Sequence, residues 1–439
     1  MSIFLIKAFQ LILSLAILVV LHELGHFIPA KLFKTKIEKF YLFFDWPFAL
    51  FKKKIGETEW GIGVLPLGGY VKIAGMIDES MDTEHLKKDP EPWEFRSKPA
   101  WQRLIIMLGG VTVNIILGFA IYMMIAFVWG KEILTNEDLP GGYEVNEIMK
   151  PYGFKDGDKI LEIDGEPLED ISEIGKYLFL RNVSDVKVQH KNGAYENLAI
   201  PDSIGTQMMN SGVMTPFTLL LPAVIGSIEP DSPAKQADLS LNDKIISVNG
   251  EEIVKWQDFK KIIEENNFSE INLEIDRDGY FLNKTVKLSE NNTIGVTVLT
   301  PKISTTKLNF TFLESISRGY DKAYWTLKDY VGQFKYVFTK KGASQLGGFG
   351  AIGSIFPASW DWQRFWETTA LLSIILAFMN VLPIPALDGG HVMFLLYEVV
   401  SGRKPNDKFM EYAQITGFML LMALVLFANG NDLYKWLFN

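Results

Sequence analysis

The sequence predicts a polytopic α-helical membrane protein with four transmembrane helices, a membrane-reentrant β-hairpin and two extracytoplasmic α+β domains. Three apolar stretches, at residues 3–21, 104–129 and 412–428, approach the length of about 20 residues that a helix needs to cross a bilayer. A further apolar region at 362–400 is interrupted by prolines and glycines. Residues 131–300 differ from all of these because they are acidic, rich in turn residues and internally repeated.

The composition indicates a polar part joined to a membrane part, because 48% of the 439 residues are hydrophobic while 22% are charged. With a net charge of −9, the chain lacks the basic footprint of a nucleic-acid-binding protein, so no nucleic-acid partner is expected. The chain contains no cysteine, which excludes a disulfide framework, thiol catalysis and thiolate zinc ligands.

The sequence His22-Glu23-Leu24-Gly25-His26 follows directly after the first apolar stretch. In a helix the two imidazoles lie four residues apart on one face, which suits a single Zn²⁺. Glu23 between them suits removal of a proton from a zinc-bound water. On this motif alone, His22 and His26 could also be interfacial histidines or histidines satisfied in a protein core. Ionisable residues at the end of a membrane-spanning helix are costly, however, and this favours a functional site.

Residues 1–30 are expected to form the first transmembrane helix, ending near Pro29. The segment is not a convincing cleavable signal, since its removal would also remove the motif. Residues 31–102 form a basic loop, which by the positive-inside rule faces the cytoplasm and leaves the N-terminus outside. The basic residues behind this orientation are Lys31, Lys34, Lys36, Lys39, Lys52, Lys53, Lys54, Arg96, Lys98 and Arg103.

Within this loop, residues 57–75 are apolar, glycine-rich and compatible with β structure. They predict a bent hairpin, which is either an ordinary cytoplasmic hairpin or one that re-enters the membrane beside the metal. Non-helical backbone is tolerated there only where it lines a protein cavity. A re-entrant hairpin could hold an extended substrate by strand addition. The candidate substrate-binding residues are Gly63, Val64, Leu65, Pro66, Leu67, Gly68, Gly69 and Tyr70.

Residues 103–130 are expected to form the second transmembrane helix. Gly109 and Gly110 favour close helix packing, and Asn114 can hydrogen-bond to a neighbouring helix. For Asn114 we favour a structural packing role, because such hydrogen bonds commonly join transmembrane helices.

Residues 131–215 and 216–300 are predicted to form two similar domains. Residues 153–166 align with residues 238–251. In each copy a turn, a short alternating strand and an Asp-Gly or Asn-Gly turn precede a helical stretch. The helical stretches are 171–180 and 256–265.

This pattern resembles tandem PDZ domains, more closely in the second copy. Asp238 and Asn242 stand where PDZ domains often have glycine. Asn242 can adopt the left-handed conformation that glycine adopts freely, and Asp238 does so less readily. Residues 203–221 are expected to be an insertion or an inter-domain linker.

Residues 301–360 are expected to contain an amphipathic helix and a Gly-rich loop. Apolar and aromatic residues recur at helical spacing between residues 308 and 341, and the glycines cluster at 347–353. The helix would lie on the membrane or pack on the helix bundle. A broken third transmembrane segment at 361–401 and a fourth transmembrane helix at 402–439 complete the chain.

Asp388 lies in the break of the third segment. The predicted topology places the end of the first helix and the second half of the third segment toward the cytoplasmic leaflet. His22, His26 and Asp388 can therefore lie at a similar depth. Two histidines and one carboxylate make a catalytic zinc set that leaves a fourth position for water. By itself, Asp388 would be interpreted as a turn cap.

Four features in this order resemble the site-2 protease family of intramembrane zinc metalloproteases, and in particular its bacterial regulator-of-sigma-E type with tandem PDZ domains. They are the motif His22–His26, the sequence Pro66–Lys72, the repeated domains, and the sequence Asn380–Gly389. The chain departs from the family at residues 110–114 and 348–352, where the family often has Gly-Pro.

The resemblance implies an intramembrane endopeptidase of the bacterial inner membrane. It implies one Zn²⁺ per chain held by His22, His26 and Asp388, with Glu23 as the catalytic base and Asn380 engaging the substrate or the oxyanion. The implied substrates are single-pass membrane proteins or peptides, such as a membrane-spanning anti-sigma factor or remnant signal peptides. The PDZ-like domains would filter substrates by size and bind extracytoplasmic peptides.

Two other classes of function are compatible with parts of the sequence. One is a non-enzymatic membrane scaffold whose PDZ-like domains bind exposed C-termini. The other is a transporter with a discontinuous helix at residues 383–390. The full set of ligands and base disfavours the scaffold, and the lack of an inverted repeat of residues 383–390 disfavours the transporter.

Overall fold

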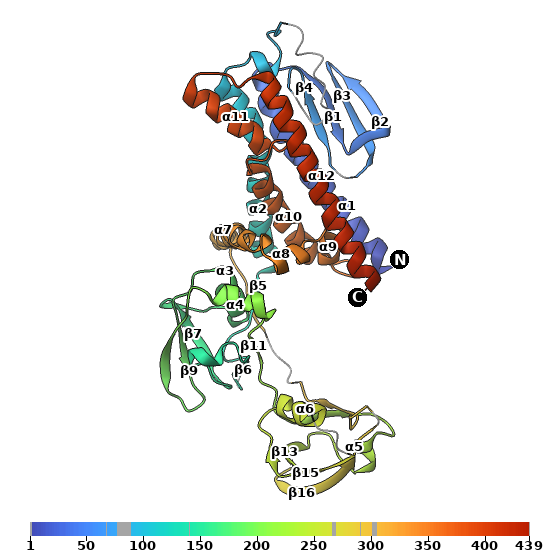
Figure 1. Cartoon of the computed structure of the whole chain (residues 1–439), viewed down its shortest axis with the longest axis vertical. Coiled ribbons are helices and arrows are strands. Elements are labelled where there is room, and N and C mark those ends of the chain that lie inside the picture. Colours follow the sequence, from blue (N-terminus) through green and yellow to red (C-terminus); the bar gives the residue numbers. More distant parts are fainter. Residues whose placement is uncertain are drawn as a thin grey trace. The chain divides into compact units, whose positions relative to one another are not determined.

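A computed structural model shows the chain as two compact units, one formed by residues 1–131 with 309–439 and the other by residues 132–308. The structure describes residues 2–66, 68–76, 89–139, 141–265, 269–289, 291–300 and 305–438. Figure 1 labels the main helices and strands of both units.

The first unit is built on long apolar helices. Among the described residues, three helices are long and apolar enough to cross a membrane: α1 (Ile3–Leu32), α2 (Ala100–Trp129) and α12 (Asp407–Phe438), the last from Lys408 onward. In the most apolar part of each helix, the share buried inside the protein is only 22% for α1, 39% for α2 and 11% for α12. Most of this apolar surface faces outward, as it does in helices that contact lipid. These helices support three of the four predicted transmembrane helices.

Prolines have different effects on two of the predicted membrane segments. Pro29 lies inside the last turns of α1, and the helix continues to Leu32, slightly beyond its predicted end. In the third segment, two prolines separate α10 (Trp362–Val381) from α11 (Asp388–Ser401), and Ala386 adopts a φ angle of 83°. Neither α10 nor α11 is by itself among the described helices that could span a membrane, so the fourth transmembrane helix stays a prediction.

A four-stranded sheet lies at the end of the helices opposite to the two chain termini (Figure 1). Its strands are β1 (Ile37–Leu42), β2 (Phe44–Ile55), β3 (Thr58–Leu65) and β4 (Tyr70–Ile73), in the order β2-β3-β1-β4. The predicted hairpin over residues 57–75 is wrong, because β1 lies between β3 and β4 and pairs with both. The sequence did not predict β1 and β2, because lysines interrupt residues 31–54 and the apolar residues of both strands alternate only irregularly with charged ones.

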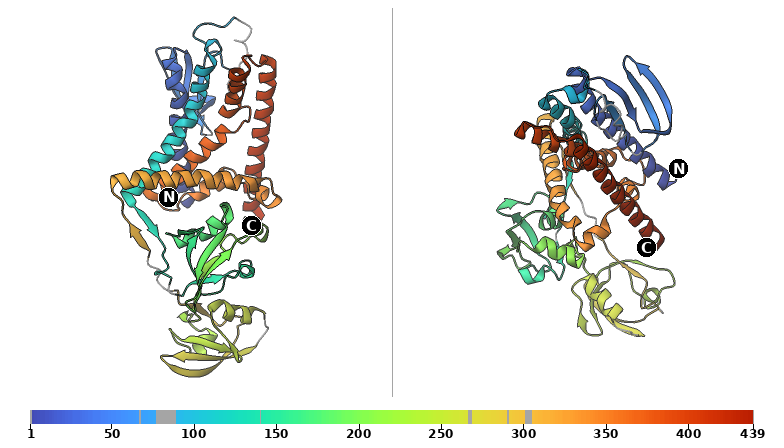
Figure 2. Two further views of the ribbon diagram at one scale, coloured as in Figure 1. Left: turned by 90° about the vertical axis from the view of Figure 1, so that its left-hand side faces the viewer. Right: turned by 45° about the horizontal axis from the view of Figure 1, so that its top comes forward.

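The amphipathic stretch predicted at residues 308–341 forms α7 (Phe312–Val337), which runs across the other helices of this unit (Figure 2). Its start is fixed by a capping box, in which the Thr311 N–H donates to the Glu314 carboxylate at 2.7 Å. Gly319 packs against α2, whereas Phe312 is 64% exposed. One face of α7 therefore packs on the bundle and the other remains apolar and uncovered. The remaining short helices of this unit are η2 (Phe95–Ser97), α8 (Lys340–Gln345) and α9 (Phe349–Ile355).

The second unit contains two repeats with the same strand order. The first has the sheet β8-β7-β9-β10 and the separate pair β6 with β11, and the second has β14-β13-β15-β16 and the pair β12 with β17. In each repeat a helix, α3 or α6, follows the short strand β8 or β14. The elements are β5 (Lys131–Ile133), β6 (Tyr143–Val145), η3 (Lys150–Tyr152), β7 (Lys159–Ile163), β8 (Glu166–Pro167), η4 (Ile171–Glu173), α3 (Ile174–Leu180), β9 (Asp185–Gln189), β10 (Tyr195–Ala199), α4 (Ile204–Ser211), β11 (Phe217–Leu219), β12 (Ile225–Ile228), α5 (Pro233–Gln236), β13 (Lys244–Val248), β14 (Glu251–Glu252), α6 (Trp256–Glu265), β15 (Glu270–Arg277), β16 (Tyr280–Lys287), β17 (Val296–Val298) and β18 (Thr306–Leu308).

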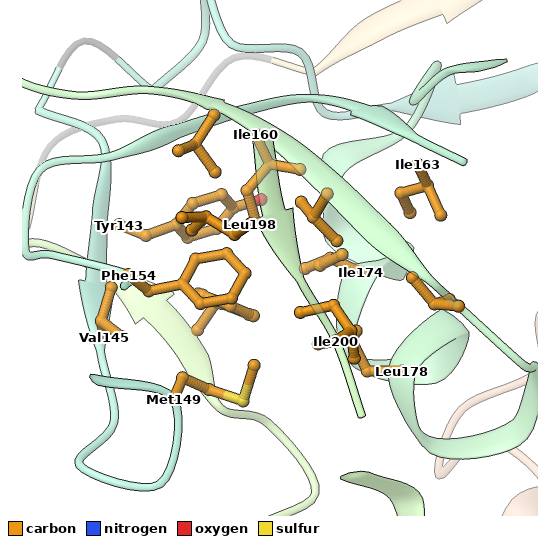
Figure 3. Packing of buried hydrophobic residues seen from close by; sticks show 14 of the residues in the cluster. Tyr143, Val145, Met149, Phe154, Ile160, Ile163, Ile174, Leu178, Leu198 and Ile200 are labelled. Atoms are coloured by element: carbon orange, nitrogen blue, oxygen red, sulfur yellow. The ribbon is translucent and has the colours of Figure 1, made fainter. Parts of the chain in front are cut away.

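The first repeat has its own hydrophobic core, in which Tyr143, Phe154 and Ile160 pack together (Figure 3). Ile204 and Met208 of α4 belong to this core, and β11 pairs with β6. The interpretation of residues 203–221 as an insertion or linker is therefore wrong up to the end of β11. These residues complete the first repeat, as β17 completes the second.

Both repeats bury an aspartate at the equivalent position, directly before β7 or β13. Asp158 is 1% exposed and Asp243 is 0% exposed. A buried carboxylate requires a partner, and the two repeats supply different ones. Asp158 is hydrogen-bonded to Nδ1 of His190 at 2.7 Å, whereas Asp243 accepts two hydrogen bonds from Arg277 at 2.7 and 2.8 Å. The first repeat thus relies on a titratable cation and the second on a permanent one.

We predict that the first repeat loses stability as the pH rises above neutral. Hydrogen bonds to Asp158 and then Glu196 raise the pKa of His190 above its ordinary value of about 6.5. Because the pKa is raised in the folded state, the stabilisation is complete below pH ~6.5 and disappears as the pH rises through the folded-state pKa. Hydrogen exchange of the whole protein, corrected for intrinsic rates, should show less protection of β9 and β10 at about pH 9 than at about pH 6.

The second repeat serves as an internal control, because Arg277 keeps its charge across this pH range. Protection of β13 and β15 should therefore be independent of pH, and His190→Gln should remove the pH dependence from the first repeat. The same pH dependence in both repeats, or in His190→Gln, would contradict the assignment.

Candidate metal centre

Three side-chain atoms from two helices converge on one point in the first unit. Nε2 of His22 lies 3.2 Å from Nε2 of His26 and 3.3 Å from Oδ2 of Asp388. Nε2 of His26 lies 3.4 Å from the same carboxylate oxygen. The three atoms form a nearly equilateral triangle, and the structure thus brings together the three residues predicted to bind a metal.

This triangle fits a tetrahedral zinc ion. Zinc–ligand bonds of about 2.0–2.1 Å at tetrahedral angles separate neighbouring ligand atoms by about 3.3–3.4 Å. Oδ2 of Asp388 is buried and has no hydrogen-bond donor in the part of the chain that the structure describes. Its lone pairs are therefore available to a metal ion. Three protein ligands leave the fourth position for water, as in catalytic zinc sites.

The hydrogen bond of His26 also suits metal binding. Nδ1 of His26 lies 2.8 Å from the backbone oxygen of Ile106 in α2. A carbonyl oxygen only accepts hydrogen bonds, so Nδ1 carries the hydrogen and Nε2 keeps its free lone pair. This arrangement, in which the outer nitrogen donates and the inner nitrogen binds, is the usual one for metal-ligating histidines.

Glycines create the contact between α1 and α2 that positions both imidazoles. A Cβ atom on Gly109 would overlap the carbonyl oxygen of Gly25, and a Cβ atom on Gly110 would overlap the rings of His22 and His26. Small residues let transmembrane helices approach to backbone contact. The predicted packing role of Gly109 and Gly110 is confirmed, and the contact that they make lies directly at the candidate metal site.

The break between α10 and α11 positions the third side chain of the triangle. Asp388 is the first residue of α11, directly after the proline-containing connection. Asn380, in the last turn of α10, has its Nδ2 atom 3.4 Å from Nε2 of His22. The interruption predicted from the sequence therefore brings both Asp388 and Asn380 to the histidines.

A cavity of about 320 Å³ opens beside the triangle. Glu23 and Asn380 both line it, and Glu23 is only 9% exposed. The backbone N–H of Val71 in β4 faces the Glu23 carboxylate. A base and an amide donor thus border the space in which a water molecule and a substrate carbonyl would meet.

The strand β4 lines the same cavity with Tyr70, Val71, Lys72 and Ile73. In the described residues β4 pairs with β1 on one side only, so its other edge is open. Of the predicted substrate-binding residues, Tyr70 therefore lines the cavity. Gly63, Val64 and Leu65 form the end of β3, where Gly63 and Leu65 pair with β2 and the pairing of β3 with β1 has ended at Ile62. Pro66, Gly68 and Gly69 lie between β3 and β4, and Leu67 is outside the described residues.

Three residues near the triangle were not predicted as site residues. Asn114 of α2 contacts His22, and His391 and Gln414 line the cavity with their side-chain nitrogens 3.4 Å apart. His391 follows Asp388 by three residues, and this helical spacing was a usable signal. Gln414 gave no such signal, because the rotation of the apolar helix α12 is not evident from its sequence.

Comparisons with known proteins agree with this geometry. The sequence matches peptidase family M50 over residues 10–424, a range that contains all three converging side chains. The chain belongs to peptidase family M50. The resemblance to site-2 proteases inferred from the sequence is thereby confirmed, and this M50 peptidase is a zinc metalloprotease.

Its relatives match it over nearly their whole length. The regulator of sigma E protease of Haemophilus influenzae is 28% identical over 97% of this chain and 98% of its own. The regulator of sigma-E protease RseP of Escherichia coli is 26% identical over 96% of this chain and 97% of its own. A provisionally named zinc metalloprotease of Neisseria meningitidis is 28% identical over 97% and 98%.

We predict that Gly110→Ala strongly weakens zinc binding by this M50 peptidase, whereas Gly118→Ala on the same helix does not. A methyl group at position 110 would displace both imidazoles. At position 118 it would lie 2.7 Å from Cδ1 of Ile374, the flexible end of a side chain that can move aside. Zinc affinity, measured by competition with a chromophoric chelator, should fall by about tenfold or more in Gly110→Ala. Equal affinities in the two variants would show that the rings do not depend on this space.

Proposed function

We propose that this protein is an intramembrane zinc endopeptidase that cleaves the transmembrane segments of single-pass membrane proteins. One observation carries the proposal: two members of a zinc-type ligand triangle and the neighbouring Glu23 lie on α1, a helix apolar and long enough to cross a membrane. In our proposal α10 and α11 form the third of four transmembrane segments. The termini and the repeat domains lie outside the bacterial cytoplasmic membrane, and the active site lies toward the cytoplasmic leaflet.

We assign His22, His26 and Asp388 as the zinc ligands and Glu23 as the catalytic base. When bound, zinc acidifies a coordinated water and polarises the scissile carbonyl. Glu23 accepts the proton of the attacking water and delivers it to the leaving amine. Glu23 suits this role because it shares a helix turn with the two histidines and its carboxylate borders the cavity.

Asn380 suits the stabilisation of the oxyanion. Its Nδ2 atom lies next to the triangle, and its side chain lines the cavity. Negative charge develops on the carbonyl oxygen of the substrate in the transition state. A hydrogen bond from an amide N–H to this oxygen is therefore stronger in the transition state than in the bound substrate. This role is distinct from binding the metal, because the amide nitrogen has no free lone pair for zinc.

We propose that β4 holds the substrate as an added strand. The N–H of Ala74 donates to Lys36 on the β1 side at 3.0 Å, whereas the N–H of Val71 points to Glu23. Since successive N–H groups alternate along a strand, Val71 and Ile73 present theirs to the open edge. A substrate helix must first unwind, because its own carbonyls are engaged in i→i−4 hydrogen bonds. Strand addition then compensates for the lost bonds.

For the natural substrates we propose a membrane-spanning anti-sigma factor or remnant signal peptides. The names of the Haemophilus influenzae and Escherichia coli relatives, regulators of sigma E, support this class. We assign the two repeats as PDZ-like domains that filter substrates by the size of their external part and bind extracytoplasmic peptides. Their shared strand order supports a common role for the two repeats.

Replacing Glu23 with glutamine tests the proposed mechanism. Glu23→Gln keeps the shape of the side chain but removes the base, so cleavage of a single-pass model substrate should fall by ~10²–10⁴-fold. Zinc content, measured by atomic emission, should stay at one ion per chain. Wild-type rates in Glu23→Gln would refute the assigned base, and loss of zinc would show instead that Glu23 supports the metal site.

The absence of native cysteine permits a cross-linking test of the substrate strand. In the Glu23→Gln background, Lys72→Cys on β4 should form a disulfide with a single cysteine placed beside the cleavage site of the substrate. Lys53→Cys on β2, at the far edge of the same sheet, is the matched control and should not. Equal cross-linking at both positions, or cross-linking at position 53 alone, would rule out strand addition at β4.

A further inference from the structure

Among the described residues, the side chain of Asn114 has one hydrogen-bonding neighbour, and that neighbour is a proposed zinc ligand. Nδ2 of Asn114 lies 3.2 Å from Nδ1 of His22. Asn114 is 1% exposed, and its Oδ1 atom is buried without a hydrogen-bond partner. A buried amide oxygen without a partner is costly and requires an explanation.

The tautomer of His22 supplies this explanation. Nε2 of His22 belongs to the ligand triangle, so it must keep a free lone pair and Nδ1 must carry the hydrogen. An N–H of Asn114 that faces this N–H would place two donors against each other. Turning the amide over about its Cβ–Cγ bond exchanges its oxygen and nitrogen, and it gives both the His22 N–H and the Asn114 oxygen a partner.

We propose that Asn114 is the positioning residue of the metal site, accepting a hydrogen bond from Nδ1 of His22. This bond fixes the metal-binding tautomer and the orientation of the imidazole. The inference rests on the proposed zinc site and adds to it a residue that we first interpreted as packing. A hydrogen bond also joins α10 to α2 at Asn114, but it uses the backbone of Asn114 and not its side chain. In this bond the Ser373 hydroxyl donates to the backbone oxygen of Asn114 at 2.7 Å.

The placement of Asn114 matches that of the group that holds the other histidine. The backbone oxygen of Ile106 lies next to Nδ1 of His26, and Ile106, Gly110 and Asn114 follow one another at intervals of four residues on α2. Such residues share one helical face. Along this face, Ile106 supports His26, Gly110 makes room for both rings, and Asn114 supports His22. A single face of α2 therefore orients both imidazoles.

Zinc affinity of purified full-length variants tests this role. Asn114→Leu keeps the approximate shape but removes the acceptor, and the affinity should fall by about 10–100-fold. Asn114→Asp keeps an acceptor at the same position and should bind zinc at least as tightly as the wild type. Ser373→Ala is the matched control: it removes the other polar contact of Asn114, and it should lower thermal stability without changing zinc affinity. Cobalt substitution adds a spectroscopic readout, because a reoriented imidazole changes the visible absorption bands in Asn114→Leu only.

The outcomes separate a positioning role from a structural one. Wild-type zinc affinity in Asn114→Leu would overturn the inference and leave the zinc site intact. If Ser373→Ala lost affinity as Asn114→Leu does, the effect would be one of packing, and the inference would fail. Should Asn114→Leu not fold, Asn114→Asp decides: a folded variant that binds zinc weakly overturns the inference, and one that binds tightly supports it. A wild-type protein without zinc affinity would refute the proposed site itself.

Discussion

The backbone contact between α1 and α2 is the interaction on which the site depends. Gly25 and Gly109 meet without any intervening side chain, and Gly110 leaves the space that the two imidazoles fill. At a larger helix separation, the Ile106 carbonyl could not reach His26. Two histidines four residues apart occur on many helices, and it is the partner helix that fixes both rings at the separation zinc requires. The glycines of α2 are therefore as much part of the candidate metal site as the three proposed ligands.

The third proposed ligand, Asp388, shows how an irregular backbone is accommodated next to apolar helices. Unpaired backbone groups are very costly in lipid, so a broken helix is stable there only where protein surrounds the break. The connection between α10 and α11 meets this condition, because Gly417 of α12 packs directly against Pro385. The break brings both Asn380, near the end of α10, and Asp388, at the start of α11, next to His22, which a continuous helix could not do.

The sequence predicted local features well and non-local pairing poorly. The two histidines were evident from helical spacing, and Asp388 from the depth that the topology assigned to it. The order of strands in the first sheet was not predictable, because β1 inserts between β3 and β4 through contacts that no short sequence pattern encodes. In the first repeat, α4 and β11 were not predicted because their place in the fold also depends on distant contacts. β11 has only three residues, and its partner β6 lies some 70 residues earlier. The role of Asn114 depends on its distance to one ring nitrogen, and no spacing rule could distinguish it from packing.

Glu23 connects the strand that would hold a substrate with the atoms that would cleave it. Its carboxylate lines the cavity beside the three converging atoms and faces the N–H of Val71 on the open edge of β4. A substrate strand that adds to β4 approaches the edge on which this N–H lies, so it also approaches the proposed base. Substrate binding and orientation of the base therefore involve the same few atoms. A helical substrate would leave this edge unpaired and keep its own carbonyls engaged, so the arrangement favours cleavage of unwound segments over folded helices.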